Sequence, residues 1–128
     1  MSGAIDWEAL VDAAERARGN AHAPYSSFPV GAAILAQGRV FAGCNVENAS
    51  FPVGICAERA ALAAAIAAGC PRIEAVVVAA ERPVAPCGMC RQPLAEFDPE
   101  VPIMMCGGSK REVASLRDLL PSPFSPTD

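Results

Sequence analysis

Three cysteines in two short motifs place the strongest constraint on how this chain can fold. Cys56 is followed two residues later by Glu58, and Cys87 and Cys90 form a C-x-x-C pair further along the chain. A C-x-x-C pair at the start of a helix can place both sulfurs on one Zn²⁺ ion, while free backbone N–H groups there steady the thiolates. Cys56, at the start of a second helix, would supply a third sulfur. The fold would then have to bring two helix starts together.

The spacing of these cysteines leaves three interpretations open. The first is a catalytic zinc site with three protein ligands and one open position, where Glu58 moves protons between water and a substrate. The second is a closed structural site, for which a fourth protein ligand is needed. The third is a site without metal, either a redox pair or a set of buried thiols. Candidates for a fourth ligand are His22, Cys44, Cys70 and Cys106.

Length, charge and composition narrow the class of protein. With 128 residues, the chain is expected to form a single domain covering residues 1–128. Its net charge of −4 and its lack of a basic run argue against a DNA or RNA partner and favour a small neutral substrate. Apolar residues make up 52% and charged residues 19% of the chain. This balance suits a subunit of an oligomer, although a merely Ala-rich protein would show it too.

The cysteine content and the N-terminal segment bear on the compartment. Residues 1–18 form an acidic amphipathic stretch that does not resemble a signal peptide, and no apolar run approaches the length of a membrane span. Six cysteines in such a chain favour reduced thiols and a metal over a disulfide framework. We therefore expect a cytoplasmic protein with no membrane partner.

The apolar pattern predicts alternating helices and strands. Asp6 is expected to cap a first helix that ends at Gly19, and residues 37–39 form a hairpin signal. The helix that follows Cys56 is apolar nearly all round and is expected to be buried. Pro93 is tolerable in the next helix only if that helix begins close before it. Helices are predicted at residues 7–18, 56–68, 88–97 and 116–120, and strands at 30–36, 40–43, 73–80, 101–106 and 112–114. This α-β-β-α-β-α-β-β-α order predicts an α/β fold, a three-layer α-β-α sandwich around a mixed sheet.

Several separated segments of the chain resemble, in the same order, the cytidine deaminase family. They are residues 23–33, 43–48, 54–59, 86–92 and 119–124. Zinc deaminases share a metal ligand two residues before a glutamate, followed by a P-C-x-x-C motif. The resemblance implies a five-stranded mixed sheet and one Zn²⁺ per subunit, bound by Cys56, Cys87 and Cys90 at the starts of two central helices. For this short all-cysteine class it also implies a homotetramer with active sites at the subunit contacts.

The resemblance assigns further roles residue by residue. Glu58 is expected to be the catalytic proton shuttle. Arg59 is expected to donate to the ligand sulfurs, offsetting the negative charge of three thiolates on one Zn²⁺. The implied substrate contacts are Phe28 as an aromatic wall for the base, Asn45 and Glu47 for the ribose, the backbone N–H of Ala57 for the base carbonyl, and Phe124 in the site of a neighbouring subunit. Phe51 stands where relatives often carry a tyrosine.

Each of these substrate contacts has a structural alternative. A place in the hydrophobic core is the default expectation for Phe28, and the alternative for Phe124 is that it covers the core of its own subunit. Asn45 is typical of a turn, and Glu47 of a solvated surface.

The implied reaction is the hydrolytic deamination of cytidine and 2′-deoxycytidine to uridine and 2′-deoxyuridine, with release of ammonia, in pyrimidine salvage. One alternative is a deaminase of a modified cytosine nucleoside such as blasticidin S. Glu47 and the tail at residues 121–124 favour plain nucleosides over that alternative. A second alternative, from another class, is a non-catalytic scaffold stabilised by zinc.

Overall fold

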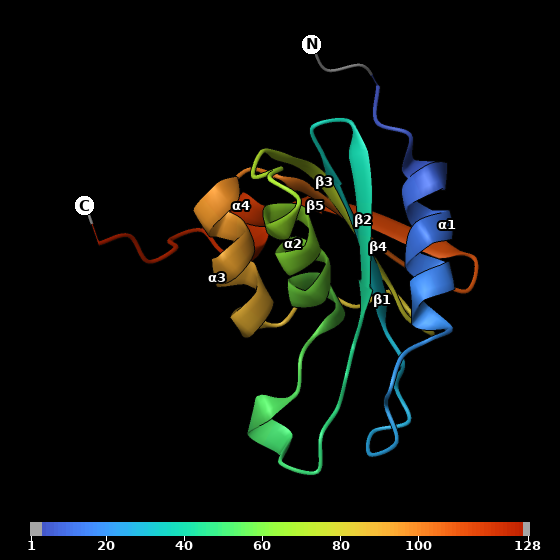
Figure 1. Ribbon diagram of the computed structural model, residues 1–128. Helices are drawn as coiled ribbons and strands as arrows, with labels where there is room; N and C mark the ends of the chain where they lie inside the picture. The colour runs from blue at the N-terminus through green and yellow to red at the C-terminus, as the bar shows by residue number, and fades with distance from the viewer. Residues whose placement is uncertain (1–3, 127–128) are drawn as a thin grey trace.

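The computed structural model describes residues 4–126 and consists of one sheet between helices (Figure 1). The elements are α1 (Trp7–Arg18), β1 (Gly31–Ala36), β2 (Arg39–Cys44), the 3₁₀ helix η1 (Phe51–Val53), α2 (Ala57–Ala67), β3 (Ile73–Ala79), α3 (Gly88–Phe97), β4 (Pro102–Gly107), β5 (Lys110–Ser115) and α4 (Leu116–Leu119). The predicted order of helices and strands is confirmed, and η1 is an additional short helix that the sequence pattern did not predict. Among the described residues, no helix has the length and apolar content that crossing a bilayer takes.

The sheet has five strands in the order β2-β1-β3-β4-β5. Strands β3 and β4 run parallel, and the other neighbouring pairs are antiparallel, so the sheet is mixed as predicted. The turn between β1 and β2 has Gln37 at φ 52° and Gly38 at φ 79°. Two successive positive φ values are what a tight two-residue hairpin requires. The predicted hairpin is therefore confirmed.

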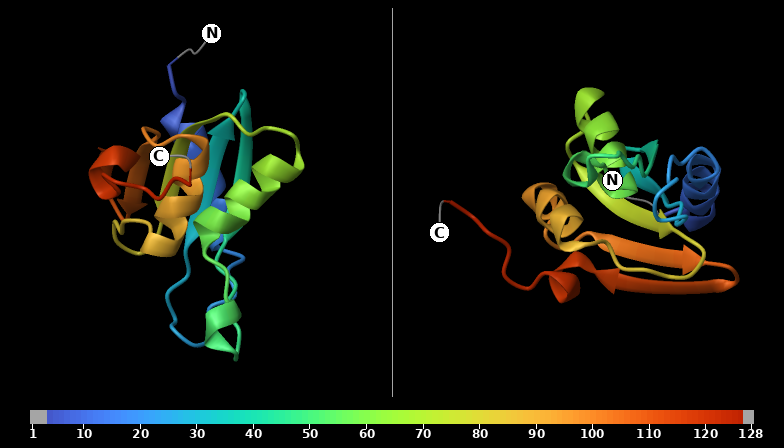
Figure 2. Two further views of the ribbon diagram at one scale, coloured as in Figure 1. Left: turned by 90° about the vertical axis from the view of Figure 1, so that its left-hand side faces the viewer. Right: turned by 90° about the horizontal axis from the view of Figure 1, so that it is seen from below.

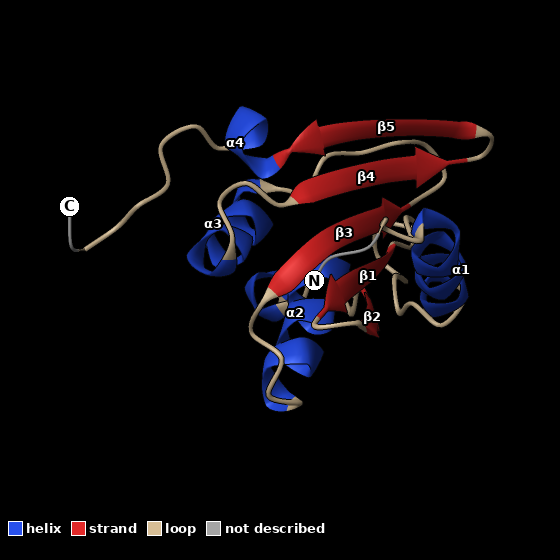
Figure 3. Cartoon of the chain, turned by 90° about the horizontal axis from the view of Figure 1, so that it is seen from above, coloured by secondary structure: helices blue, strands red, loops and turns tan. Residues whose placement is uncertain are grey.

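Alternate residues of the central strands face two separate cores, one on each side of the sheet. Ile34 and Val76 face the cluster that includes residues of α2 and α3, whereas Ala33 and Val77 face the cluster that includes Leu10 of α1. Figure 3 shows α1 on one side of the sheet and α2 with α3 on the other. The central strand β3 is covered on both faces along residues 75–79, an apolar run that is buried throughout. These two cores confirm the three-layer arrangement.

The prediction that the helix after Cys56 is buried all round is wrong for one face of α2. Its buried apolar residues are Ala57, Ala61, Leu62 and Ala65, whereas Ala63, Ala64, Ile66 and Ala67 are exposed. The helix packs on β1 and β2 with one side only. A helix that is apolar all round carries no pattern that tells which face will meet the sheet.

Helix α3 begins at Gly88, but Pro93 is its sixth residue and lies beyond the first turn. The predicted bounds of this helix, residues 88–97, are confirmed, whereas the expectation that position 93 needs no helical amide partner is wrong. Without an N–H, Pro93 leaves the carbonyl of Met89 without its usual donor. The helix continues to Phe97 because Cys90, Leu94 and Ala95 are buried along its inner face.

Two long loops extend beyond the sheet as a single arm, which we call the loop arm (residues 22–29 and 46–55). It projects at the bottom of Figure 1, with η1 at its tip, and Figure 2 shows the same projection from the side. Isolated β-bridges pair His22 with Val46 and Val46 with Ile55. The second loop leads directly into α2, so the loop arm ends immediately before Cys56.

Gly43 of β2 fixes how closely α2 approaches the sheet. A Cβ atom at this position would lie 2.5 Å from the backbone N of Ala61 and 2.8 Å from the carbonyl O of Ala57. Both of these are backbone atoms, which cannot rotate away as a side chain can. The absence of a side chain at Gly43 therefore sets the position of the start of α2.

We expect Gly43→Ala to lower the free energy of unfolding by roughly 1–3 kcal/mol, the usual cost of overpacking a core. Chemical denaturation measures this loss. Gly88→Ala is the matched control, because a Cβ there meets nothing within 4 Å. The control is expected to keep wild-type stability. A Gly43→Ala protein as stable as the wild type would show that the approach of α2 is not fixed by this glycine.

Candidate metal centre and active site

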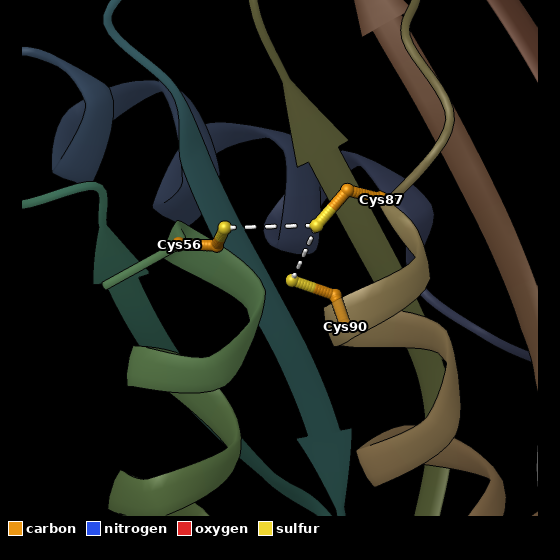
Figure 4. Close-up of side chains that lie close together, drawn as sticks. All are labelled: Cys56, Cys87 and Cys90. Atoms are coloured by element: carbon orange, nitrogen blue, oxygen red, sulfur yellow. Dashed lines mark hydrogen bonds between the residues drawn. The ribbon is translucent and has the colours of Figure 1, made fainter. Parts of the chain in front are cut away.

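The three motif cysteines lie together at the starts of α2 and α3. Cys56 is the residue that caps α2, Cys87 caps α3, and Cys90 lies buried in the first turn of α3. The Sγ atoms of Cys56 and Cys87 are 3.8 Å apart, and those of Cys87 and Cys90 are 3.6 Å apart (Figure 4). All three sulfurs lie within 4.8 Å of one another. The two helix starts therefore converge, as the motifs predicted.

This geometry fits a tetrahedral zinc ion. Bonds of about 2.3 Å from Zn²⁺ to each sulfur require sulfurs about 3.8 Å apart, close to the separations observed. The sulfurs are too far apart for a disulfide bond, and all six cysteines are free. In the part of the chain that the structure describes, no fourth His, Cys, Asp or Glu joins the group. The proposed alternatives His22, Cys44, Cys70 and Cys106 lie outside it, which favours a site with an open position over a closed structural one.

The cysteines do not share the same electrostatic environment. A hydrogen bond from the Cys90 thiol, assisted by Arg59 and Cys87, lowers the pKa of Cys56 to about 5. The pKa of Cys90 is raised, first because this thiol is the donor to Cys56 and then because it is buried. Nη2 of Arg59 lies 3.8 Å from Sγ of Cys56 and 3.4 Å from the carbonyl O of Gly54. The lowered pKa favours the thiolate form of Cys56, and the guanidinium of Arg59 lies beside it.

Glu58 is a carboxyl group held almost out of water, with 5% of its surface exposed. It is the second residue of α2 and follows Cys56 by two positions. Burial raises the pKa of Glu58, and the nearby Cys56 charge raises it further, while its own backbone N–H and Arg59 act in the opposite direction. A carboxyl group with a raised pKa beside a metal site can both accept and release a proton near neutral pH.

Asn45 and Glu47, the predicted ribose ligands, form hydrogen bonds to the loop before β1. Asn45 accepts from the backbone N–H of Val30 at 2.8 Å and donates to the carbonyl O of Phe28 at 3.0 Å. Glu47 accepts from the N–H groups of Tyr25 and Ser26 and from the Ser26 hydroxyl, which lowers its pKa. The two side chains therefore shape the loop that carries Phe28, a role that the sequence did not reveal. Their contact with ribose stays a prediction.

A pocket of about 320 Å³ lies in the loop arm. It is lined by Tyr25, Ser26, Glu47, Asn48, Phe51 and Gly54. The rings of Tyr25 and Phe51 meet edge to face at 5.4 Å. Since the carbonyl of Gly54 also accepts from Arg59, one side of the pocket is tied to the residue that contacts Cys56.

The other predicted substrate contacts occupy different places. Phe28 is half-buried, belongs to neither core cluster, and carries the Arg82 guanidinium 5.0 Å from its ring centre. Ala57 is the buried first residue of α2, beside Cys56. Phe124 is 74% exposed in the C-terminal tail, which runs outward past α3 (Figures 1 and 2). The structure leaves their contacts with a substrate as predictions.

Two residues that follow the C-x-x-C pair were not predicted to have a role. Arg91 donates to the carbonyl groups of Pro86, at 2.6 Å, and of Leu119, at 2.7 Å. Gln92 forms two hydrogen bonds with the backbone of Phe124. Leu119 and Phe124 lie 28 and 32 residues away in sequence from Arg91 and Gln92, and no local pattern points to them.

Comparison with known proteins places this geometry in a family. Residues 5–106 match the model of the cytidine and deoxycytidylate deaminase zinc-binding region. A cytidine deaminase of Sporosarcina psychrophila is 41% identical, over 97% of this chain and 95% of its own. The crystal structure of cytidine deaminase from Burkholderia pseudomallei is 45% identical, with a TM-score of 0.89, over 94% of this chain and all of its own. That from Mycobacterium tuberculosis is 38% identical, with a TM-score of 0.82, over 95% and 99%.

The fold, the three gathered cysteines and the relatives agree along nearly the whole chain. The matched family model is a zinc-binding one, and the cysteine cluster supplies the donor set that zinc prefers. The chain therefore belongs to the cytidine and deoxycytidylate deaminase family of zinc-binding enzymes.

Proposed function

We propose that this chain, as a single domain of residues 1–128, catalyses the zinc-dependent hydrolysis of cytidine and 2′-deoxycytidine to uridine and 2′-deoxyuridine, with release of ammonia. The observation that carries the proposal is the buried carboxyl group of Glu58 beside three sulfurs at zinc-binding separations. A purely structural zinc site has no need of a buried carboxyl group next to its ligands. The relatives named above are cytidine deaminases, which supports the same substrate.

In this proposal, Cys56, Cys87 and Cys90 hold the metal, and Arg59 offsets part of their negative charge. Zn²⁺ bound there supplies an acidified water for attack on C4 of the base. Glu58 accepts the proton that the attacking water loses and delivers it to N3 of the base. Glu58 then transfers the second proton of the water to the leaving amine, so that water and the nucleoside are converted to ammonia and the uracil product.

The charge of the site supports a neutral nucleoside. The pocket in the loop arm is lined by Glu47, with its pKa lowered, and by no lysine or arginine among the described residues. An ionised carboxylate suits the hydroxyl groups of a sugar. We propose that Asn45 and Glu47 bind the ribose, that Phe28 forms a wall for the base, and that the backbone N–H of Ala57 binds its carbonyl group.

We further propose a homotetramer in which Phe124 completes the site of a neighbour. Exposed apolar side chains at and beside η1 support an interface there, including Phe51, Val53 and Ile55. The exposed ring of Phe124 supports a role outside its own core. Six free cysteines are in keeping with a reducing cytoplasm and with a place in pyrimidine salvage.

Serine substitution of Cys56, Cys87 or Cys90 is expected to abolish zinc binding and activity together. A neutral hydroxyl is a far poorer zinc ligand than a thiolate, so the content should fall well below the expected value of about one zinc per chain. Elemental analysis of purified protein measures this. Cys44→Ser is the matched control, because Cys44 lies outside the sulfur cluster, and it should keep its zinc. Full zinc content in Cys87→Ser would contradict the ligand assignment.

Glu58→Gln is expected to keep zinc, fold and nucleoside binding, while kcat falls by at least roughly 10²-fold, the low end for a lost general acid–base. Glutamine has the same shape but cannot carry the proton. An absorbance assay on cytidine, with zinc measured in the same sample, tests this. Glu112→Gln, on the exposed strand β5, is the control. Near-normal turnover in zinc-loaded Glu58→Gln would assign proton transfer to another group.

Phe124→Ala is expected to raise KM by roughly 10-fold or more if its ring is buried against the base. Subunits with Phe124→Ala and subunits with Glu58→Gln are then co-expressed. At cytidine concentrations below the wild-type KM, mixed oligomers should regain activity. Some of their sites would combine an intact Glu58 with a Phe124 from another chain. A blend of the two separately purified variants is the control. No recovery despite proven mixing would mean that the tail serves its own subunit or no site.

A further inference from the structure

The C-terminal tail is attached to the body through its backbone. The side-chain amide of Gln92 donates from Nε2 to the carbonyl O of Phe124 at 3.1 Å. The same amide accepts at Oε1 from the N–H of Phe124 at 3.0 Å. Both hydrogen-bonding groups of one backbone residue are thus satisfied by one side chain, as they would be by a neighbouring strand. We call this pair of bonds the amide clamp.

The amide clamp is built on α3, the helix whose start carries two of the three metal cysteines, Cys87 and Cys90. Gln92 follows Cys90 by two residues in α3. Its neighbour Arg91 joins the carbonyl groups of Pro86, just before Cys87, and of Leu119, at the end of α4. Consecutive side chains of α3 therefore fix the entry to the cysteine motif, the end of the last helix and the tail. The backbone of Phe124 is therefore held by the same helix that positions Cys87 and Cys90.

Apolar packing does not explain how the C-terminal tail is held in place. Tail residues 121–126 form no helix or strand, and Phe124 belongs to neither core cluster. A groove of about 580 Å³ lies between the tail and the second half of α3. With 74% of Phe124 exposed, the clamp orders its backbone and leaves its ring available. This is the arrangement expected where a ring is presented to a partner molecule.

We propose that Gln92 is a positioning residue, whose amide fixes the backbone of Phe124 so that the ring is presented to a substrate-binding site. The substrate part of this inference rests on the proposed function. An amide matches both groups of a backbone residue, whereas a carboxylate accepts but does not donate, and a leucine does neither. The residue type at position 92 should therefore set how well the ring is placed.

The experiment compares Gln92→Leu, Gln92→Glu, Phe124→Ala and the double variant Gln92→Leu/Phe124→Ala as full-length, zinc-loaded proteins. Losing two neutral hydrogen bonds should raise KM for cytidine by roughly 3- to 10-fold in Gln92→Leu, with kcat and zinc content little changed. Gln92→Glu, which keeps only the acceptor, should fall between the wild type and Gln92→Leu. The double variant should match Phe124→Ala alone, because Gln92 acts through the ring.

A readout independent of activity is hydrogen exchange at the backbone amide of residue 124. Its exchange should be protected in the wild type and should accelerate by at least roughly 5-fold in Gln92→Leu, since the amide loses its acceptor. Equal exchange in the two proteins would overturn the clamp. Additive effects on KM in the double variant would overturn action through Phe124 and indicate a general effect on α3.

The two proposals fail in distinguishable ways. A wild-type protein without activity on cytidine overturns the proposed function and the substrate part of this inference. Faster exchange in Gln92→Leu would still support the clamp in that case. Full activity with unchanged KM in Gln92→Leu, together with faster exchange, would show that the clamp orders the tail but does not serve the site.

Discussion

The structure depends on the convergence of two helix starts that bring three sulfurs together. Thiolates repel one another, so sulfur separations of 3.6 and 3.8 Å need compensation. The free N–H groups at the starts of α2 and α3 provide part of it, and the guanidinium of Arg59 another part. A bound divalent cation would provide the rest. The close approach at Gly43 and the buried faces of both helices hold this arrangement in place.

Burial of Glu58 gives the same site a carboxyl group with a raised pKa. Removing a carboxylate from water is costly, and the group responds by holding its proton more tightly, which its raised pKa expresses. The neighbouring Cys56 has its pKa lowered instead. Burial raises the pKa of Glu58, whereas hydrogen bonding lowers the pKa of Cys56, although only one residue separates the two groups. Such a divergence is typical of sites that exchange protons with a substrate.

Local chemistry in the sequence predicted much of this fold. Asp6 caps α1 through the N–H of Ala9, and the turn at Gln37 and Gly38 closes the first hairpin. The apolar run at residues 75–79 of β3 is typical of a strand covered on both faces. Each of these features depends on residues within a few positions of one another, where the pattern is sufficient. The convergence of the cysteines was predicted because their chemistry requires one shared ion.

The features that the sequence did not reveal depend on contacts between distant segments. Asn45 binds residues 15 and 17 positions away, and Glu47 binds residues 21 and 22 positions away. The exposed face of α2 followed from packing against one side of the sheet and not from its composition. Helix α3 has its predicted bounds, but Pro93 lies beyond its first turn, where burial of Leu94 and Ala95 outweighs one missing hydrogen bond.

The loop and the tail that are proposed to contact the substrate are both held by hydrogen bonds from side chains to their backbone. Asn45 and Glu47 hold the loop that carries Phe28, and Gln92 holds the tail that carries Phe124, in each case through hydrogen bonds to the backbone. Hydrogen bonds are directional, whereas apolar packing is not, so they fix orientation without burying the group that they orient. The rigid three-layer core positions the cysteines and Glu58 by packing. The surrounding loops are positioned by polar contacts, and the ring of Phe124 stays exposed to solvent.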